Sequence, residues 1–268
     1  FYRAIKLNGR TLVESPLKLE SGRYEVDFDD FEEKAKDCKL FILCSPHNPV
    51  GRVWTEAELR RLGDICLKHN VLVISDEIHF DLIMPGHKHV SFPTLGEEYA
   101  DHCAMFSAAS KTFSLAGLCV ANAIVPNPEL RQKLEEQVNI SGCNTYSIFG
   151  IRALETGYWK CADWVDQLNQ HIWGNYCYLK DFMAKHFPDV WVADLEGTYL
   201  AWFDCRGFGM DGHALGDYLR EKAGLYLDDG YIFGPAGDGF ERLNLACPRK
   251  VLEEALDRFK SAMDRLKK

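Results

Sequence analysis

The chain has 268 residues, of which 47% are hydrophobic and 26% charged, so it is long enough for one large globular domain or two medium ones. Its formal net charge of −9 argues against a nucleic-acid-binding protein or a protein bound to an anionic membrane surface. No apolar run approaches the ~20 residues of a membrane span, so no transmembrane segment is expected.

The ten cysteines are scattered along the chain, without a C-x-x-C pair. This favours reduced, mostly buried thiols over a disulfide framework, and therefore a cytoplasmic location. His87 and His89 form the only tight histidine pair, but no cysteine or carboxylate stands at ligand spacing. We expect a solvated loop there and no metal site.

In the first half of the chain, apolar runs alternate with amphipathic segments. Four strands are predicted by "LFILCS" (40–45), "VLVISDE" (71–77), "HCAMFSAAS" (102–110) and "LCVANAIV" (118–125). Thr55 and Glu58 form a capping box that starts a helix, and Asn127-Pro128 starts another. This rhythm predicts a mostly parallel sheet flanked by helices.

The pattern changes near residue 150. A helical repeat of apolar residues covers about 163–186, and Pro188 ends it. The segments "VWVAD" and "TYLAWFDC" alternate like strands, and a helix over 214–223, the strand "ERLNLAC" and a C-terminal helix follow. We predict a larger domain at residues 1–155 and a smaller α+β domain at 156–268, which includes the long bridging helix.

The glycine-rich stretch "GYIFGPAGDGF" (230–240) resembles a phosphate-binding loop. However, Asp228, Asp229 and Asp238 lie in or beside it, and their charge disfavours an anion. We interpret it as a turn-rich segment that positions the strand of Arg242.

Polar side chains follow the ends of three predicted strands. They are Ser45, His47 and Asn48 after the first, Asp76 and His79 after the second, and Ser107, Ser110 and Lys111 after the third. Taken singly, Asn48 is typical of a turn residue, Asp76 of a residue that caps the next element, and Lys111 of a lysine on the protein surface. Because the carboxyl ends of parallel strands share one edge, where ligands bind, we expect an amide, a carboxylate and a lysine to converge.

This combination suits catalysis by pyridoxal 5′-phosphate (PLP). The aldehyde of PLP needs a lysine for a Schiff base, its ring nitrogen needs a carboxylate, and its phenolic oxygen needs a hydrogen-bond donor. The stretch "SAASKTFSLAGL" (107–118) has no acidic residue beside Lys111. An acidic partner would stabilise the ammonium form and so oppose imine chemistry.

Five motifs carry a resemblance to a known family: "SPHNPVGRVWTEAEL", "VLVISDEIHFDL", "SAASKTFSLAGL", "GTYLAWFD" and "GFERLNLACPR". They occur in the family's order and cover essentially the whole chain. The chain resembles the fold-type I PLP-dependent enzymes of aminotransferase class I/II, and within them the MalY/PatB group of cystathionine β-lyases (C–S lyases). The resemblance implies an α/β fold with a smaller α+β C-terminal domain, a PLP cofactor and a homodimer.

The resemblance also implies roles for the residues that match the motifs. Lys111 would be the Schiff-base lysine and proton shuttle, Asp76 the partner of the ring nitrogen, and Asn48 the donor to the phenolic oxygen. Ser110, and with it Ser107, would contact the cofactor phosphate.

Other matching positions bear on substrate and subgroup. Arg242 would grip the substrate α-carboxylate, a task that suits a planar guanidinium, although an exposed strand arginine is the alternative. His79 would join the cofactor-binding residues at a position where many aminotransferases have tyrosine. Cys119 replaces a phosphate-binding arginine of aminotransferases, and Val50 replaces their usual threonine. These departures favour a lyase.

Family chains carry a further long segment before the one that matches "FYRAIKLNG". It supplies a phosphate loop, an aromatic residue that stacks on the ring, and a tyrosine that reaches across the dimer. We therefore expect the chain to be N-terminally truncated.

The resemblance implies a carbon–sulfur β-lyase that cleaves cystathionine or cysteine-type amino acids to a thiol, pyruvate and ammonia through a Schiff base on Lys111. Two alternatives stay open. One is an aminotransferase of class I/II, and the other is an inactive fragment or a regulator-binding protein.

Overall fold

The computed structural model describes residues 1–266, which pack into two compact units. Unit 1 contains Phe1–Pro46, Val53–Ile83 and Lys88–Val165. Unit 2 contains His47–Arg52, Met84–His87 and the chain from Asp166 onward. The functional domains 1–155 and 156–268 stay a prediction, because the units are defined by packing alone.

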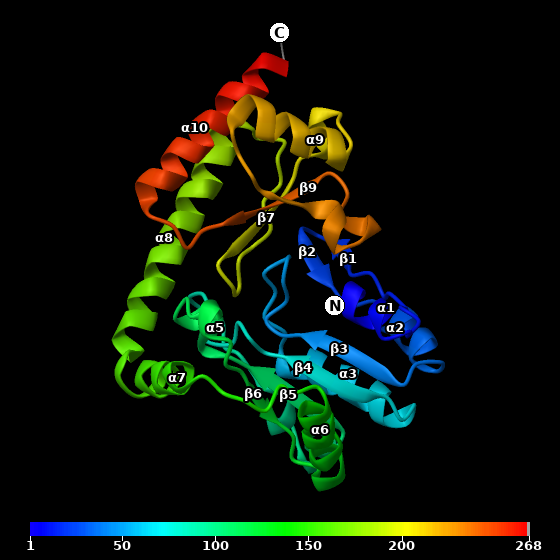
Figure 1. Ribbon diagram of the computed structural model, residues 1–268. Helices are drawn as coiled ribbons and strands as arrows, with labels where there is room; N and C mark the ends of the chain where they lie inside the picture. Colours follow the sequence, from blue (N-terminus) through cyan, green and yellow to red (C-terminus); the bar gives the residue numbers. More distant parts are fainter. Residues whose placement is uncertain (267–268) are drawn as a thin grey trace. The chain divides into compact units, whose positions relative to one another are not determined.

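A four-stranded sheet forms the centre of unit 1 (Figure 1). Its strands are β3 (Leu40–Cys44), β4 (Leu72–Asp76), β5 (Cys103–Ser107) and β6 (Asn122–Ile124), in that order. The first three strands are parallel to one another and β6 pairs antiparallel with β5. The strand expected at 118–125 is thus shorter, because a 3₁₀ turn and a left-handed Cys119 precede it.

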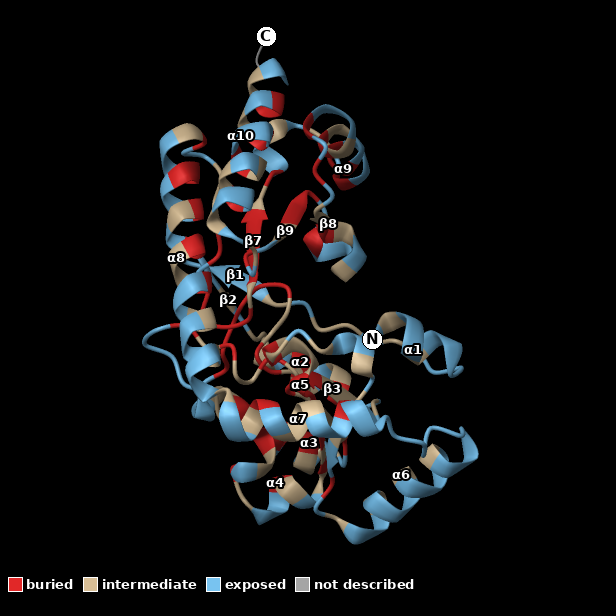
Figure 2. Cartoon of the chain, turned by 60° about the vertical axis from the view of Figure 1, so that its left-hand side comes forward, coloured by how far each residue is buried: buried red, intermediate tan, exposed pale blue. Residues whose placement is uncertain are grey.

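The other elements of unit 1 include a small hairpin and several helices. They are α1 (Tyr2–Leu7), β1 (Lys18–Glu20), β2 (Arg23–Glu25), α2 (Phe28–Ala35), α3 (Glu56–Lys68), α4 (Glu97–Asp101), α5 (Ala109–Thr112), α6 (Pro128–Ile140) and α7 (Ile148–Lys160). Leu59, Leu62 and Ile65 of α3 pack in one buried cluster with Val73 and Cys103 of the sheet. Helix α6 begins where expected but buries none of its side chains (Figure 2).

Unit 2 is built on a three-stranded antiparallel sheet and long helices. The strands β7 (Leu200–Asp204), β9 (Phe240–Asn244) and β8 (Asp228–Asp229) pair in the order β7-β9-β8. Helices α8 (Ala162–His186) and α10 (Arg249–Leu266) lie side by side, and α9 (Gly212–Tyr218) completes the set (Figures 1 and 2). The ring of Phe259 on α10 meets those of Phe187 and Phe203 at centroid distances of 5.5 and 6.1 Å.

Two expectations for local structure are wrong. The segment "VWVAD" forms no strand but one isolated bridge, Val192 to Phe203, across which the Ala193 N–H donates to the Trp202 carbonyl at 2.9 Å and the Asp204 N–H to the Trp191 carbonyl at 2.8 Å. His87 is exposed as expected, whereas the side chain of His89 turns inward and contacts buried Glu77.

The cysteines are free thiols, as expected, but most are not buried. Only Cys66, Cys103 and Cys205 are buried, while Cys119, Cys143 and Cys177 are exposed. No helix within residues 1–266 is long and apolar enough to cross a membrane.

Candidate active site

The parallel strands of unit 1 end in register. Cys44 pairs with Asp76, and Asp76 pairs with Phe106, so Ser45, Asp76 and Ser107 lie along one edge of the sheet. The Ser45 N–H donates to the Asp76 carbonyl at 3.0 Å, which carries the alignment one residue beyond β3. The strand-end side chains of unit 1 are therefore brought together.

A cavity of about 370 Å³ opens at this edge. Its lining residues are Phe1, Ile42, Ile74, Asp76, Ile78, Phe106, Ser107, Ala108 and Ala121. The walls are hydrophobic apart from the Asp76 carboxylate and Ser107. Such a cavity suits a flat, largely apolar group that carries one positive charge.

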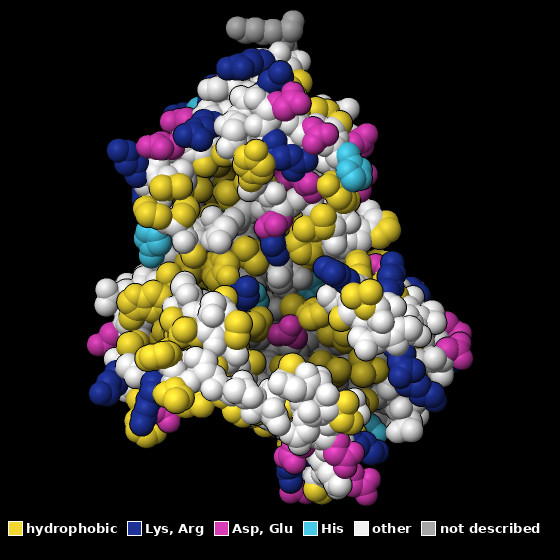
Figure 3. Space-filling model, in the orientation of Figure 1, with side chains coloured by type: hydrophobic (Ala, Val, Ile, Leu, Met, Phe, Trp, Pro, Cys, Tyr) yellow, Lys and Arg dark blue, Asp and Glu magenta, His cyan; other side chains and the backbone are white. Residues whose placement is uncertain are grey.

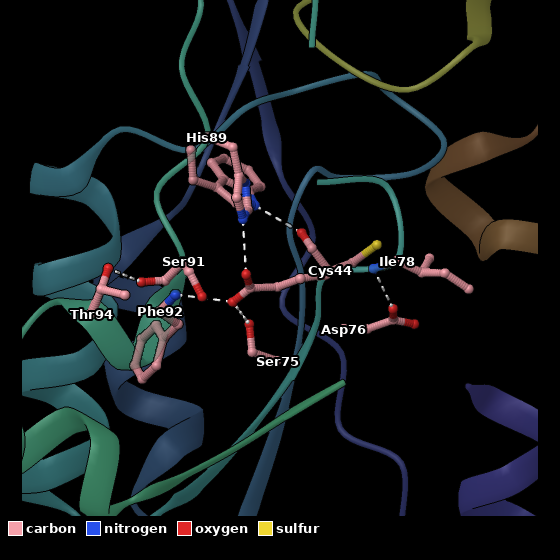
Figure 4. A network of polar contacts seen from close by, with 10 residues as sticks. Cys44, Ser75, Asp76, Ile78, His89, Ser91, Phe92 and Thr94 are labelled. Atoms are coloured by element: carbon pink, nitrogen blue, oxygen red, sulfur yellow. Dashed lines mark hydrogen bonds and ion pairs between the residues drawn. The ribbon is translucent and has the colours of Figure 1, made fainter. Parts of the chain in front are cut away.

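The Asp76 carboxylate is half-buried at the end of β4. Its Oδ1 accepts a hydrogen bond from the Ile78 N–H at 3.2 Å (Figure 4). Burial raises the pKa of Asp76, while this hydrogen bond and the positive charge of Lys111 oppose the shift. A further cation beside this carboxylate would stabilise its ionised form, because a nearby positive charge offsets the cost of burial.

Lys111 lies on α5, the short helix that follows β5, and is half-buried. It forms no ion pair with any residue of the described chain, although its charge reaches Asp76. Ser110 is half-buried, and the buried Ser107 hydroxyl accepts from the Asn122 side-chain amide at 3.4 Å. The lysine thus stands near a carboxylate without being neutralised by a direct partner.

His79 and Glu77 follow Asp76 and point to different surroundings. His79 is buried in the turn after β4, where its carbonyl accepts from the Leu82 N–H at 2.9 Å. Glu77 is fully buried and binds three partners: the Ser75 hydroxyl at 2.8 Å, the Phe92 N–H at 2.9 Å and His89 Nε2 at 2.8 Å (Figure 4).

Sequence reasoning missed this role of Glu77. A signal was present, because consecutive residues of a strand face opposite sides of the sheet, so "DE" places one carboxylate toward each face.

Unit 2 holds the two remaining candidates, Asn48 and Arg242, in direct contact. Arg242 Nη1 donates to Asn48 Oδ1 at 2.6 Å, while Nη2 and Nε donate to Asp228 Oδ2 at 2.6 and 3.2 Å. The guanidinium carbon also lies 4.6 Å from the centre of the Phe233 ring. Sequence reasoning treated Asp228 as a flanking charge and missed its ion pair with Arg242.

His47, a further strand-end residue, also belongs to unit 2. Its backbone N–H donates to the Arg52 carbonyl at 2.7 Å. Burial, with a smaller effect of the Arg52 charge, lowers the pKa of His47 to about 4, so its imidazole is neutral near pH 7.

The residues of the unit 1 cavity fit PLP. A protonated pyridine nitrogen would supply the positive charge that Asp76 gains from, and the isoleucine and phenylalanine walls suit the faces of an aromatic ring. Lys111 follows the same sheet edge on α5 and offers an amine without an ion-pair partner.

Comparison with known proteins identifies the family. Residues 1–259 match the family Aminotransferase class I and II. Cystathionine β-lyase PatB of Bacillus subtilis (strain 168) is 37% identical, over 98% of this chain and 68% of the relative. Protein MalY of Escherichia coli (strain K12) is 34% identical, over 96% of this chain and 66% of the relative. The chain thus spans about two thirds of the length of these relatives.

Solved structures agree with this result. Cystalysin from Treponema denticola, which contains a PLP cofactor, superposes with a TM-score of 0.97 at 41% identity, over 99% of this chain and 68% of that one. The PLP-bound C–S lyase from Staphylococcus hominis gives a TM-score of 0.92 at 33% identity, over 98% of this chain and 67% of that one. The predicted fold type is confirmed, and the chain belongs to the aminotransferase class I and II family, among its cystathionine β-lyase relatives.

Proposed function

We propose that the chain is the larger part of a PLP-dependent carbon–sulfur β-lyase. Its substrates would be amino acids such as cystathionine or cysteine, and its products a thiol, pyruvate and ammonia. The observation that carries the proposal is the Asp76 carboxylate in an apolar cavity, with Lys111 on the next element and without an ion-pair partner. The names of the relatives support the same chemistry.

The side chains of unit 1 would divide the work. When bound, PLP supplies an electrophilic aldehyde and a protonated ring that withdraws electrons from the substrate Cα. The Lys111 amine would hold the cofactor covalently at rest and would take the Cα proton once released. Asp76 would keep the ring nitrogen protonated, and Ser107 and Ser110 would lie toward the phosphate. His79, buried after β4, would contribute to the cofactor pocket.

The side chains of unit 2 would act on the substrate and on the phenolic oxygen. Arg242 is suited to a carboxylate because a planar guanidinium donates two parallel hydrogen bonds. The Asn48 oxygen accepts from Arg242, and an asparagine amide also carries an N–H₂ group of the kind that can donate to a phenolic oxygen.

A homodimer is part of the proposal. Helix α7 exposes several large hydrophobic side chains, and hydrophobic side chains gather at the surface in this part of the molecule in Figure 3. Ile148, Phe149 and Trp159 are 76%, 81% and 85% exposed. Such a patch marks a protein–protein contact more often than a solvated surface.

A cytoplasmic location is also part of the proposal, and the free thiols support it.

The deciding experiment is pyruvate release from cystathionine by the purified protein with added PLP. Visible absorbance of the lysine-bound cofactor is recorded in parallel for the wild type and Lys111→Ala. We expect absorbance and pyruvate from the wild type and neither from Lys111→Ala. Amino transfer to a 2-oxo acid without pyruvate would establish an aminotransferase instead, and a wild type without absorbance would favour an inactive fragment or a regulator-binding protein.

A further inference from the structure

Asp81 and Thr112 join the two segments that carry Asp76 and Lys111. The Thr112 hydroxyl donates to Asp81 Oδ2 at 2.8 Å, across 31 residues of sequence. Asp81 belongs to the turn after β4, and Thr112 follows Lys111 directly on α5. Thr112 is fully buried, so water cannot replace this hydrogen bond without a local opening.

Helix α5 needs such an anchor because it is too short to be stable alone. It has four residues, and its N-cap residue Ala108 provides no side-chain hydrogen bond. A helix of one turn fixes several backbone angles for very few hydrogen bonds. Contacts from outside the helix must therefore define where Lys111 lies.

Aromatic side chains lie around the contact between Asp81 and Thr112. The Tyr158 ring stacks with Phe80 at a centroid distance of 6.3 Å and meets Phe113 edge-on at 5.3 Å. Burial, together with the Asp81 charge, raises the pKa of Tyr158 to about 12. Gly157 lies against the Phe113 ring, where an added Cβ would approach to 2.8 Å. An aromatic cluster thus lies beside the half-buried Asp81 carboxylate.

We propose that Asp81 is a positioning residue that holds α5, and with it the Lys111 amine, through its hydrogen bond with Thr112. Its significance for catalysis rests on the proposed function. A displacement of about 1 Å can slow an oriented reaction by roughly 100-fold, because the reacting atoms must meet at a defined distance and angle.

Paired substitutions separate the hydrogen bond from packing. Thr112→Val and Asp81→Ala remove it, whereas Thr112→Ser and Asp81→Asn keep a donor and an acceptor. Thr94→Val is the matched control, since it removes an exposed hydroxyl that donates only to the Ser91 carbonyl at 2.6 Å. Thermal unfolding and circular dichroism of each variant establish that it folds.

The first measurement is hydrogen exchange of the backbone amides of Phe113 and Leu115, which donate to the Ala109 and Ser110 carbonyls of α5 at 2.9 and 3.0 Å, and the second is the rate at which added PLP develops its visible absorbance. We expect Thr112→Val and Asp81→Ala to speed exchange at least tenfold and slow cofactor attachment by about 10- to 100-fold. The double variant should be no worse than Asp81→Ala, because that variant has already lost the bond to Thr112. Thr112→Ser, Asp81→Asn and Thr94→Val should stay near the wild type.

The inference is wrong if Thr112→Val leaves exchange and attachment unchanged, or if the two single effects add in the double variant. A variant that fails to fold does not block the test, because Thr112→Ser and Asp81→Asn must then restore folding and slow exchange together. Failure of the proposed function is a distinct result: the wild type would develop no absorbance with PLP, while exchange in α5 would still respond to Thr112→Val.

Discussion

Two adjacent carboxylates at the end of β4 have opposite environments. Asp76 borders an apolar cavity and has one backbone donor, whereas Glu77 is fully buried outside that cavity and has three hydrogen-bond partners. The two carboxylates have different surroundings because successive side chains along an extended chain point to opposite faces of the sheet. One carboxylate is left available to a ligand, and the other anchors the loop that contains His89 and Phe92.

Arg242 provides a first test among single residues. Arg242→Lys replaces a planar guanidinium, which can donate two parallel hydrogen bonds, with a compact ammonium group. We therefore expect KM for the amino-acid substrate to rise by about 10- to 100-fold with a smaller change in kcat. Steady-state kinetics measure both. Arg220→Lys is the control, because Arg220 pairs with Asp229 and Asp217 in the same unit; an equal rise in KM there would contradict a role specific to Arg242.

Glu241 provides a test that depends on pH. Both of its oxygens are buried, without a hydrogen-bond partner among residues 1–266. Burial, with the nearby charge of Asp229, raises the pKa of Glu241 to about 8 against an opposing effect of Arg220. Between pH 4.5 and pH 8 the folded chain keeps this proton while the unfolded chain has lost it, so stability falls as pH rises.

Glu241→Gln should remove that dependence. We expect the free energy of unfolding of the variant to exceed that of the wild type at pH 8 by about 1–3 kcal/mol and to approach it near pH 5. Denaturant unfolding at both pH values measures the difference. A difference that does not change with pH would mean that Glu241 is already ionised in the folded protein.

Among the elements, α3 follows its sequence most directly. The Thr55 hydroxyl accepts from the Glu58 N–H at 3.2 Å, and the Glu58 carboxylate accepts from the Thr55 N–H at 2.8 Å. Thr55→Ala should lower the free energy of unfolding by about 1 kcal/mol, since it leaves a terminal N–H unsatisfied, while Thr55→Ser should preserve it. Denaturant titration measures both. An unchanged stability in Thr55→Ala would mean that solvent replaces the cap.

The elements also mark the limit of prediction from sequence. β3, β4 and β5 are confirmed because short apolar runs flanked by polar residues have few alternatives. The antiparallel β6 and the missing strand in "VWVAD" were not predicted, because pairing partners and their direction depend on distant parts of the chain. The same holds for the contacts of Arg242 with Asp228 and of Thr112 with Asp81, whereas Asp76 and Lys111 stand out because Asp76 ends one strand and Lys111 comes shortly after another.

For the whole molecule, the apolar surface of α7 predicts an association state. Phe149→Glu and Trp159→Glu should shift the protein toward monomer, because each places a charge in the proposed interface. Sedimentation velocity across a concentration series measures the change. Tyr226→Glu is the control, since Tyr226 is 82% exposed in unit 2 and lies outside the patch. A wild type that is already monomeric would overturn this prediction.

Unit 2 combines segments that are far apart in the sequence, and this affects the order in which the chain folds during synthesis. Arg52 forms its buried ion pair with Glu196, 144 residues later, and the Gly51 carbonyl accepts from the Glu196 and Gly197 N–H groups. At a synthesis rate of about 5–20 residues/s, the segment of residues 47–52 emerges from the ribosome roughly 7–30 s before these partners exist. During that interval a buried arginine of the folded protein is solvated on a nascent chain, and unit 2 can close only after Glu196 and Gly197 have been made.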